Sequence, residues 1–426
     1  MKKILFCFLL IIFSGVLSAQ VESVPFLWGH EWTVGARALG MAGSFTGISD
    51  DCSALYYNPA GIGQIDRITA YAGFSHLSIS ESARFLGTTT SEDAAFTKLN
   101  SAGVCVPLPT TRGSLVLGIG YHVVRDFNRS LYVTGFSSLP GDSVTYSYNE
   151  LEEGSLTNTT FGASIEVAPG LFVGGSINFW QGSNDYTWQM KDEDKPFDIW
   201  TYSRFTGTTY INTSLTGVNF TFGGFFNSNG LFSAGGVIVT PVTLTGKEDW
   251  EYEEMTYWDD GLQTRDSTDS GYWDYKIRSP WIFRFGGALK AGPLLISGDI
   301  EFKNYSQIKY ITEPSKSSEN LVQDNLYFRQ NFRNVTDYRV GCEFTIPNTT
   351  IRLRAGYGFL ASPLKHSKND RKIIGLGAGV GVSDQIFLDI GYGFTSWDGQ
   401  GSDEISNERI EAKKILVTMM YKIYRR

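Results

Sequence analysis

Alternation between apolar residues and small or polar residues dominates this chain from about residue 68 onward. From Ile374 to Val382, apolar side chains occupy every second position, and glycine occupies each position between them. Successive side chains of a β-strand point to opposite faces, so such a segment presents one apolar face and one bare face. Fourteen segments of the chain show related alternation between clusters of turn-forming residues, which predicts an all-β protein.

The expected strands and their connections suggest a closed arrangement. The strands are expected at about 68–78, 102–108, 113–125, 157–167, 171–190, 207–226, 231–250, 272–290, 294–311, 329–346, 349–360, 371–383, 385–398 and 407–424. Tight turns such as 168–170, 291–293 and 347–349 alternate with longer polar connections such as 137–153, 251–271 and 312–328. An even strand number with short turns at one end and long loops at the other is typical of transmembrane barrels. The sequence therefore predicts a 14-stranded antiparallel transmembrane β-barrel over residues 67–426.

The first 19 residues predict export. Lys2 and Lys3 precede an apolar run from Ile4 to Phe13, and small residues surround Ala19. This arrangement is typical of a signal peptide, here expected at 1–19 and removed from the mature protein. Together with the barrel pattern, it predicts the outer membrane of a Gram-negative-type (diderm) bacterium. The expected partners there are outer-membrane lipid, lipopolysaccharide and the barrel assembly machinery.

Residues 20–66 do not show the alternation of a strand. They are dense in glycine and alanine, and Asn58-Pro59 interrupts them because a residue before proline disfavours helical geometry. A compact segment of small residues could pack closely against the inside of a barrel wall. We therefore expect a hatch inside the lumen, with a simple N-terminal extension as the alternative.

This segment also carries a family resemblance. Ala36-Arg37, Gly40-Met41-Ala42-Gly43, the acidic pair Asp50-Asp51 and the ending Tyr57-Asn58-Pro59-Ala60-Gly61 resemble the N-terminal signature of the FadL/TodX family. The resemblance implies an outer-membrane channel for passive transport of hydrophobic small molecules such as long-chain fatty acids or hydrocarbons. It further implies that Asp50, Asp51, Asn58, Pro59, Ala60 and Gly61 form the hatch motif. The signature is also similar in PorV-like proteins, so an outer-membrane partner of a protein secretion system is the alternative function.

The expected strand register divides the wall residues between lipid and lumen. Trp281, Phe283, Phe285, Ile351, Leu353 and Tyr357 should face lipid. Trp180 and Trp397, near strand ends, are expected in the aromatic girdles at the membrane interfaces. Arg284, Arg339, Arg352 and Arg354 should face the lumen, where a guanidinium could hold the carboxylate of a fatty acid. The same face carries Glu166, Asp299, Glu301, Glu343 and Asp389. Cross-strand ion pairs that brace the wall are therefore the alternative role for these arginines.

Other function classes find little support. The formal net charge of −8 argues against a nucleic-acid partner, which would favour a basic face. The four histidines do not show metal-ligand spacing, and the chain lacks a G-x-S-x-G nucleophile motif. We expect neither an enzyme, nor a bound metal, nor a cofactor.

Overall fold

The computed structural model describes residues 30–137, 144–194, 200–228, 230–312, 318–365, 370–399 and 405–423. The expected signal peptide at 1–19 lies outside these residues. Within the described ranges, no helix is both long and apolar enough to cross a membrane.

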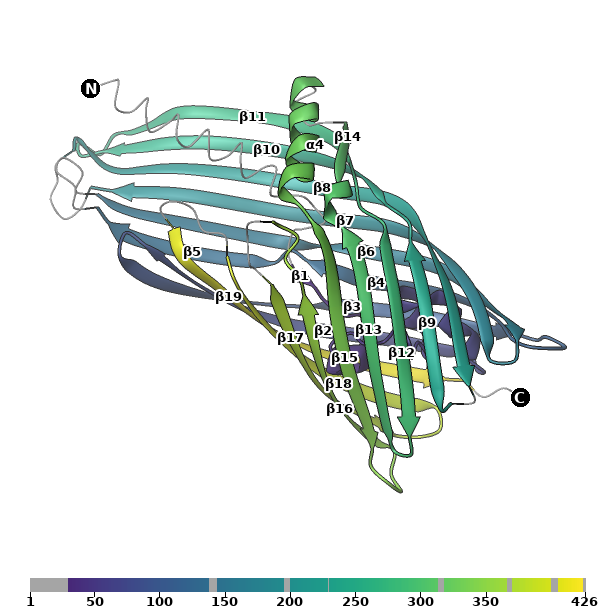
Figure 1. The fold of residues 1–426 in the computed structure, drawn as a ribbon. Coiled ribbons are helices and arrows are strands. Elements are labelled where there is room, and N and C mark those ends of the chain that lie inside the picture. Colours follow the sequence, from purple (N-terminus) through teal and green to yellow (C-terminus); the bar gives the residue numbers. More distant parts are fainter. Residues whose placement is uncertain are drawn as a thin grey trace.

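Strands form a single closed wall (Figure 1). They are β2 (Thr69–Phe85), β3 (Thr88–Leu108), β4 (Leu115–Asp126), β5 (Arg129–Phe136), β6 (Thr145–Ala168), β7 (Leu171–Glu193), β8 (Tyr202–Ser228), β9 (Phe232–Val239), β10 (Thr243–Trp258), β11 (Gln263–Arg278), β12 (Ile282–Ala291), β13 (Leu294–Asn304), β14 (Lys309–Thr312), β15 (Asn334–Thr345), β16 (Ile351–Leu360), β17 (Arg371–Gly381), β18 (Ile386–Asp398) and β19 (Ile405–Lys422). The pairing of β19 with β2 closes the barrel. Four of the barrel strands are each interrupted once and therefore appear as two elements: β4–β5, β9–β10, β11–β12 and β13–β14. When each interrupted strand is counted once, the wall is the predicted 14-stranded antiparallel barrel.

The remaining elements lie at the two ends of the lumen. They are β1 (His30–Glu31), α2 (Ala36–Gly40), α3 (Ala54–Tyr57), the 3₁₀ helix η1 (Pro59–Gln64), the 3₁₀ helix η2 (Tyr305–Gln307) and α4 (Ser318–Asn331). The N-terminal elements, purple in Figure 1, lie inside the wall near the end with the short turns. Helix α4 lies toward the opposite end of the wall. Most side chains from residue 32 to residue 65 are buried, as expected for a hatch in the lumen.

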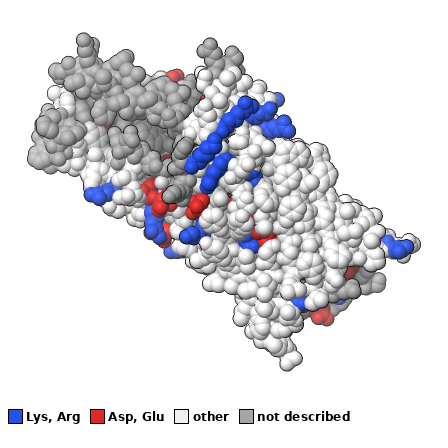
Figure 2. All heavy atoms as spheres, in the orientation of Figure 1, with Lys and Arg blue, Asp and Glu red and all other residues white. Residues whose placement is uncertain are grey.

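The exterior of the barrel is apolar, and the predicted register is confirmed. Six side chains expected to face lipid are all exposed: Trp281, Phe283, Phe285, Ile351, Leu353 and Tyr357. Arg284 and Arg354 are buried on the other face of the same strands. Figure 2 shows that charged side chains gather in clusters on one face of the molecule, while a broad neighbouring area carries almost none. A closed strand ladder with an apolar exterior is characteristic of an outer-membrane β-barrel.

Several strands are longer than predicted. The first two, expected at 68–78 and 102–108, form the long hairpin β2–β3, and the expected loop at 251–271 is mostly the hairpin β10–β11. The ladder continues where both faces of these strands meet polar surroundings, as at Glu251 and Glu253. Apolar alternation disappears there because neither face meets lipid, although the backbone pairing persists. Conversely, the strand expected at 329–346 begins only at Asn334, because residues up to Asn331 belong to α4.

Two predicted strands are broken at prolines. The segment 231–250 divides at Thr240–Val242 around Pro241, and 272–290 divides at Ser279–Trp281 around Pro280. Proline cannot donate to a ladder, so both prolines were a readable signal for a break. The girdle assignment of Trp180 and Trp397 was wrong. Trp180 points into the lumen with Asn178, two residues earlier on β7, and Trp397 is buried against the hatch.

We predict that Leu376→Arg destabilises the folded barrel by about 2–4 kcal/mol, the cost of a lipid-facing arginine near the bilayer midplane. Leu376 is exposed in the middle of β17, between strands whose outward residues are also apolar. The free energy of unfolding is measured by denaturant titration of the protein folded into lipid vesicles. Leu262→Arg, in the exposed β10–β11 turn, is the matched control and should cost little. Equal stability of both variants would contradict the assigned lipid face.

Candidate functional site

The backbone of the hatch rests directly on glycines of the wall. A Cβ added at Gly356 would lie 2.2 Å from the carbonyl carbon of Met41, and one added at Gly375 would lie 2.3 Å from the Leu39 carbonyl oxygen. Gly174, across the barrel, approaches the backbone of the hatch in the same way. The bare face of β17 therefore lets α2 lie against the wall without intervening side chains.

The predicted hatch motif forms a turn that is fastened to the wall. Asn58 Oδ1 accepts a hydrogen bond from the Ala60 backbone nitrogen at 3.1 Å, and its Nδ2 donates to the Gly224 carbonyl oxygen at 3.1 Å. Pro59 begins η1, and Ser164 Oγ of β6 donates to the Ala60 carbonyl oxygen at 2.7 Å. A Cβ at Gly61 would lie 2.2 Å from the Ser49 carbonyl oxygen, which explains why a glycine ends the motif.

The acidic pair of the motif holds Arg37 of α2. Asp50 forms an ion pair with Arg37, which also bonds Glu343 of β15 through Nε at 2.8 Å. Burial opposes the charge of Arg37, but the neighbouring carboxylates of Asp50 and Glu343 raise its pKa. Asp51 instead accepts hydrogen bonds from the backbone nitrogen and hydroxyl of Ser53, at 2.8 and 2.6 Å, at the start of α3. Burial, and next the charge of Asp50, raises the pKa of Asp51.

Three of the four predicted lumen arginines form ion pairs with carboxylates of the wall. Arg284 pairs with Glu301, and Arg339 Nη2 lies 3.6 Å from the same carboxylate. Arg354 bonds Glu343 at 2.7 Å and Asp389 at 2.6 Å. Among the described residues, Arg352 has no ion pair. These contacts match the alternative in which cross-strand ion pairs brace the wall. Contact between the arginines and a ligand headgroup stays a prediction.

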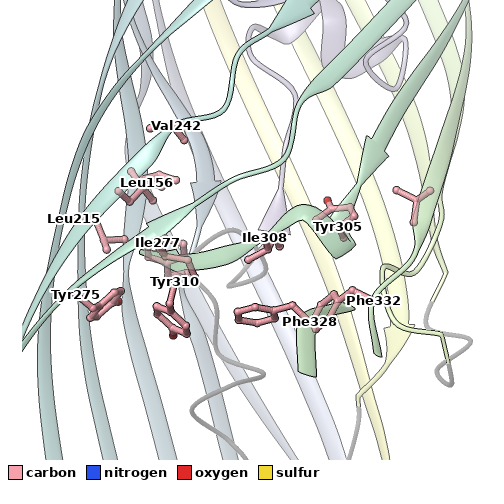
Figure 3. Packing of buried hydrophobic residues seen from close by; sticks show 13 residues of the cluster. Leu156, Leu215, Val242, Tyr275, Ile277, Tyr305, Ile308, Tyr310, Phe328 and Phe332 are labelled. Atoms are coloured by element: carbon pink, nitrogen blue, oxygen red, sulfur yellow. The ribbon is translucent and has the colours of Figure 1, made fainter. Parts of the chain in front are cut away.

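A partly open cavity of about 90 Å³, here called the chamber, lies above the hatch. Leu55 and Tyr56 of α3 line its lower side, and Val242 and Tyr305 belong to an apolar cluster on its upper side. In Figure 3 the cluster residues Tyr310, Phe328 and Phe332 lie side by side, with ring centroids 5.7 Å apart between neighbours. Phe328 comes from α4 and is fully buried in this cluster.

On one side, the chamber borders the place where the wall strand β4–β5 is interrupted. Between β4 and β5 the chain turns at Phe127 and Asn128, and β5 then packs Leu131 and Val133 against Ala83 and Phe85 of β2. The β3–β4 ladder covers only 101–108 of β3, so 88–100 have no ladder partner on that side within the described chain. Val124 and Arg125 line the chamber at the point where β4 bends. The chamber thus borders the place where the β3–β4 ladder ends. Beyond it β5 lies beside β3, and Thr90 Oγ1 donates to the Tyr132 carbonyl oxygen at 2.7 Å.

Amide side chains on β6, β7 and β8, the strands that follow β4 around the wall, also line the chamber, and the sequence analysis missed them. Asn158, Asn178 and Asn219 lie on the neighbouring strands β6, β7 and β8. In the ladder Asn178 lies opposite Asn219, whereas Asn158 lies opposite Trp180. Asn178 Nδ2 donates to Asn219 Oδ1 at 3.0 Å, and Trp180 Nε1 donates to the same oxygen at 2.8 Å. Their shared inward register was a readable signal, but only the ladder register could place them at one level. We call Asn158, Asn178, Asn219 and Trp180 the amide wall.

Comparison with known proteins identifies the fold. No family model and no curated protein matches the sequence. The structure is similar to the crystal structure of a Pseudomonas aeruginosa FadL homologue, with a TM-score of 0.61 and 13% identity over 93% of this chain and 100% of that one. It is also similar to the Pseudomonas putida toluene transporter TodX, with a TM-score of 0.60 and 13% identity over 93% and 100% of the two chains. The Ralstonia pickettii toluene transporter TbuX has a TM-score of 0.59 and 11% identity over 92% and 99%. This chain therefore has the FadL/TodX fold.

We predict that Gly356→Val displaces the hatch while the barrel still assembles. The added side chain would overlap the backbone of Met41, and forced overpacking of this kind costs about 1–3 kcal/mol. The measurement is ion conductance of the purified protein in planar lipid bilayers, where the variant should conduct more than the natural protein.

The matched control is Gly298→Val on the lipid-facing side of β13. Within 4 Å, a Cβ there would meet only the Arg339 carbonyl oxygen, at 3.9 Å, so conductance should not change. Equal conductance of Gly356→Val and the control would show that the hatch does not depend on this close contact.

Proposed function

We propose that this protein is an outer-membrane channel through which hydrophobic small molecules pass by diffusion. The observation that carries the proposal is that the chamber borders the bend of β4, beside the end of the β3–β4 ladder. A docking protein for secreted partners would not need an enclosed apolar compartment. A channel for molecules that prefer lipid to water does need one.

The arrangement of the chamber suggests a route. An apolar molecule that leaves water for the cluster around Val242 and Phe328 gains free energy from the hydrophobic effect. From the chamber, the hatch blocks the straight path toward the short-turn end, whereas the bend at Val124 would provide a lateral exit. The cargo would then leave sideways into the apolar part of the bilayer, without crossing the aqueous periplasm.

The named transporters with the same fold support cargo of this kind. TodX and TbuX are described as toluene transporters, and CymD as a monoaromatic hydrocarbon channel. Long-chain fatty acids are the other cargo that the N-terminal resemblance implies. A fatty acid would need a cation for its carboxylate, and Arg284, Arg339 and Arg354 are already paired.

We predict that Val242→Trp lowers uptake of small hydrophobic molecules to near the background of cells without the protein. Val242 lines the chamber, so the larger side chain would fill it. The measurement is uptake of radiolabelled toluene and oleate by cells that lack other hydrophobic channels, with surface level quantified in parallel. The control is Val218→Trp, since Val218 faces lipid on β8 and should leave uptake unchanged.

Two results would contradict this function. One is uptake that Val242→Trp does not reduce, because cargo would then bypass the chamber. The other is a natural protein that transports no member of a broad hydrophobic panel. The PorV-like secretion partner would then be the better account.

A further inference from the structure

The amide wall has one donor group that the protein itself leaves unused. Both hydrogens of Asn178 Nδ2 are taken, by Asn219 Oδ1 at 3.0 Å and by Thr221 Oγ1 at 2.9 Å. Asn219 Nδ2 donates to the Thr240 carbonyl oxygen at 2.7 Å. Asn158 accepts a hydrogen bond from Thr160 at Oδ1, but within the described residues its Nδ2 has no acceptor. This nitrogen belongs to a side chain that is 97% buried and lines the chamber.

The network also restricts how Asn158 can turn. Thr160 Oγ lies within hydrogen-bonding distance of both Asn158 Oδ1 and Asn178 Oδ1, so it links Asn158 to the rest of the amide wall. With its oxygen held in this way, the amide of Asn158 keeps its nitrogen as the free group. A ligand oxygen placed there would accept the hydrogen bond that this nitrogen does not make within the described residues.

Each cation that lines the chamber is paired with a carboxylate. Its cations are Arg125, Arg284 and Lys303, and the carboxylates that pair with them are Glu31, Glu301 and Asp337. Lys303 alone contacts all three carboxylates, with Nζ 2.6 Å from Glu301 Oε1 and 3.1 Å from Glu31 Oε2. A ligand carboxylate would therefore find no lining cation without a carboxylate partner, and burial of such a charge is unfavourable. The chamber therefore favours uncharged ligands.

Much of the rest of the lining is apolar. Leu55, Val124, Leu156, Val242 and Ile282 contribute hydrocarbon side chains to the chamber. From this combination we propose that the chamber selects uncharged molecules with an apolar body and one hydrogen-bond acceptor, such as an aryl ketone, and that Asn158 Nδ2 donates to this acceptor. The proposal rests on the channel function above and specifies its preferred cargo.

Three probes of nearly the same shape test the proposal: acetophenone, which has a ketone oxygen, cumene, which has none, and benzoate, which is charged. Their binding to the purified full-length protein is measured with radiolabelled ligand in detergent, and their entry is measured in proteoliposomes. Acetophenone should bind about tenfold more tightly than cumene, as expected for one added hydrogen bond in a buried site. Benzoate should bind more weakly than acetophenone.

Asn158→Leu should remove the preference for acetophenone and leave cumene binding unchanged, which also shows that the chamber is intact. Asn158→Ser keeps a donor and should retain part of the preference. The control is Asn149→Leu on the same strand, where the side chain is exposed outside the chamber. This variant should behave as the natural protein.

The possible failures are distinguishable. If cumene and acetophenone bind equally, or if Asn158→Leu keeps the preference, the assignment of the acceptor site is wrong while the channel function stands. Preferential binding of benzoate would overturn the neutral-ligand assignment. If none of the probes binds or enters vesicles above the protein-free background, the channel function fails, and the inference that rests on it fails as well.

Discussion

The structure depends on one constraint: backbone amide and carbonyl groups cannot remain unpaired in lipid. Closure of the ladder between β19 and β2 satisfies this constraint around the circumference. The wall can be interrupted only where other parts of the protein cover the freed groups. At the bend after β4, β1 pairs with Arg125 and Asp126 from inside the barrel, and β5 folds against β2. The requirement for pairing thus determines both the closed exterior and the places where an opening can exist.

The hatch is held by a second, local contact between two backbones. Wall glycines such as Gly356 and Gly375 remove the side-chain layer, and polar wall groups then reach the backbone of the hatch directly. Asp299 accepts hydrogen bonds from the backbone nitrogens of Phe45 and Thr46, at 2.9 and 2.7 Å. The Arg37–Glu343–Arg354 ion pairs connect the hatch to β15 and β16. Because these contacts close the lower lumen, the chamber above them has no direct exit toward the short turns. In the proposed function, cargo therefore leaves sideways at the bend of β4.

Much of this arrangement could be predicted from the sequence, because alternation reports the face of each side chain. It placed Leu376 and its neighbours toward lipid and Arg284 toward the lumen, and the Asn58-Pro59 break marked the turn of the hatch. Alternation does not report which inward residues meet across strands. The pairing of Arg284 with Glu301 and the alignment of Asn158, Asn178 and Asn219 follow from ladder register, which depends on the whole wall. Strand extensions with polar residues, such as Glu251 to Glu254, lie in a predicted loop. Backbone pairing outside lipid requires no apolar pattern, so the sequence does not reveal it.

The central claim is that small hydrophobic molecules occupy the chamber between the amide wall and Val242. The most direct measurement is the anomalous diffraction of crystals of the full chain soaked with bromobenzene, because bromine reports its own position. Our account predicts a bromine peak inside the chamber, above Tyr56 and within contact of Val242. Bromine peaks confined to the lipid-facing exterior, with the chamber filled by water, would contradict it.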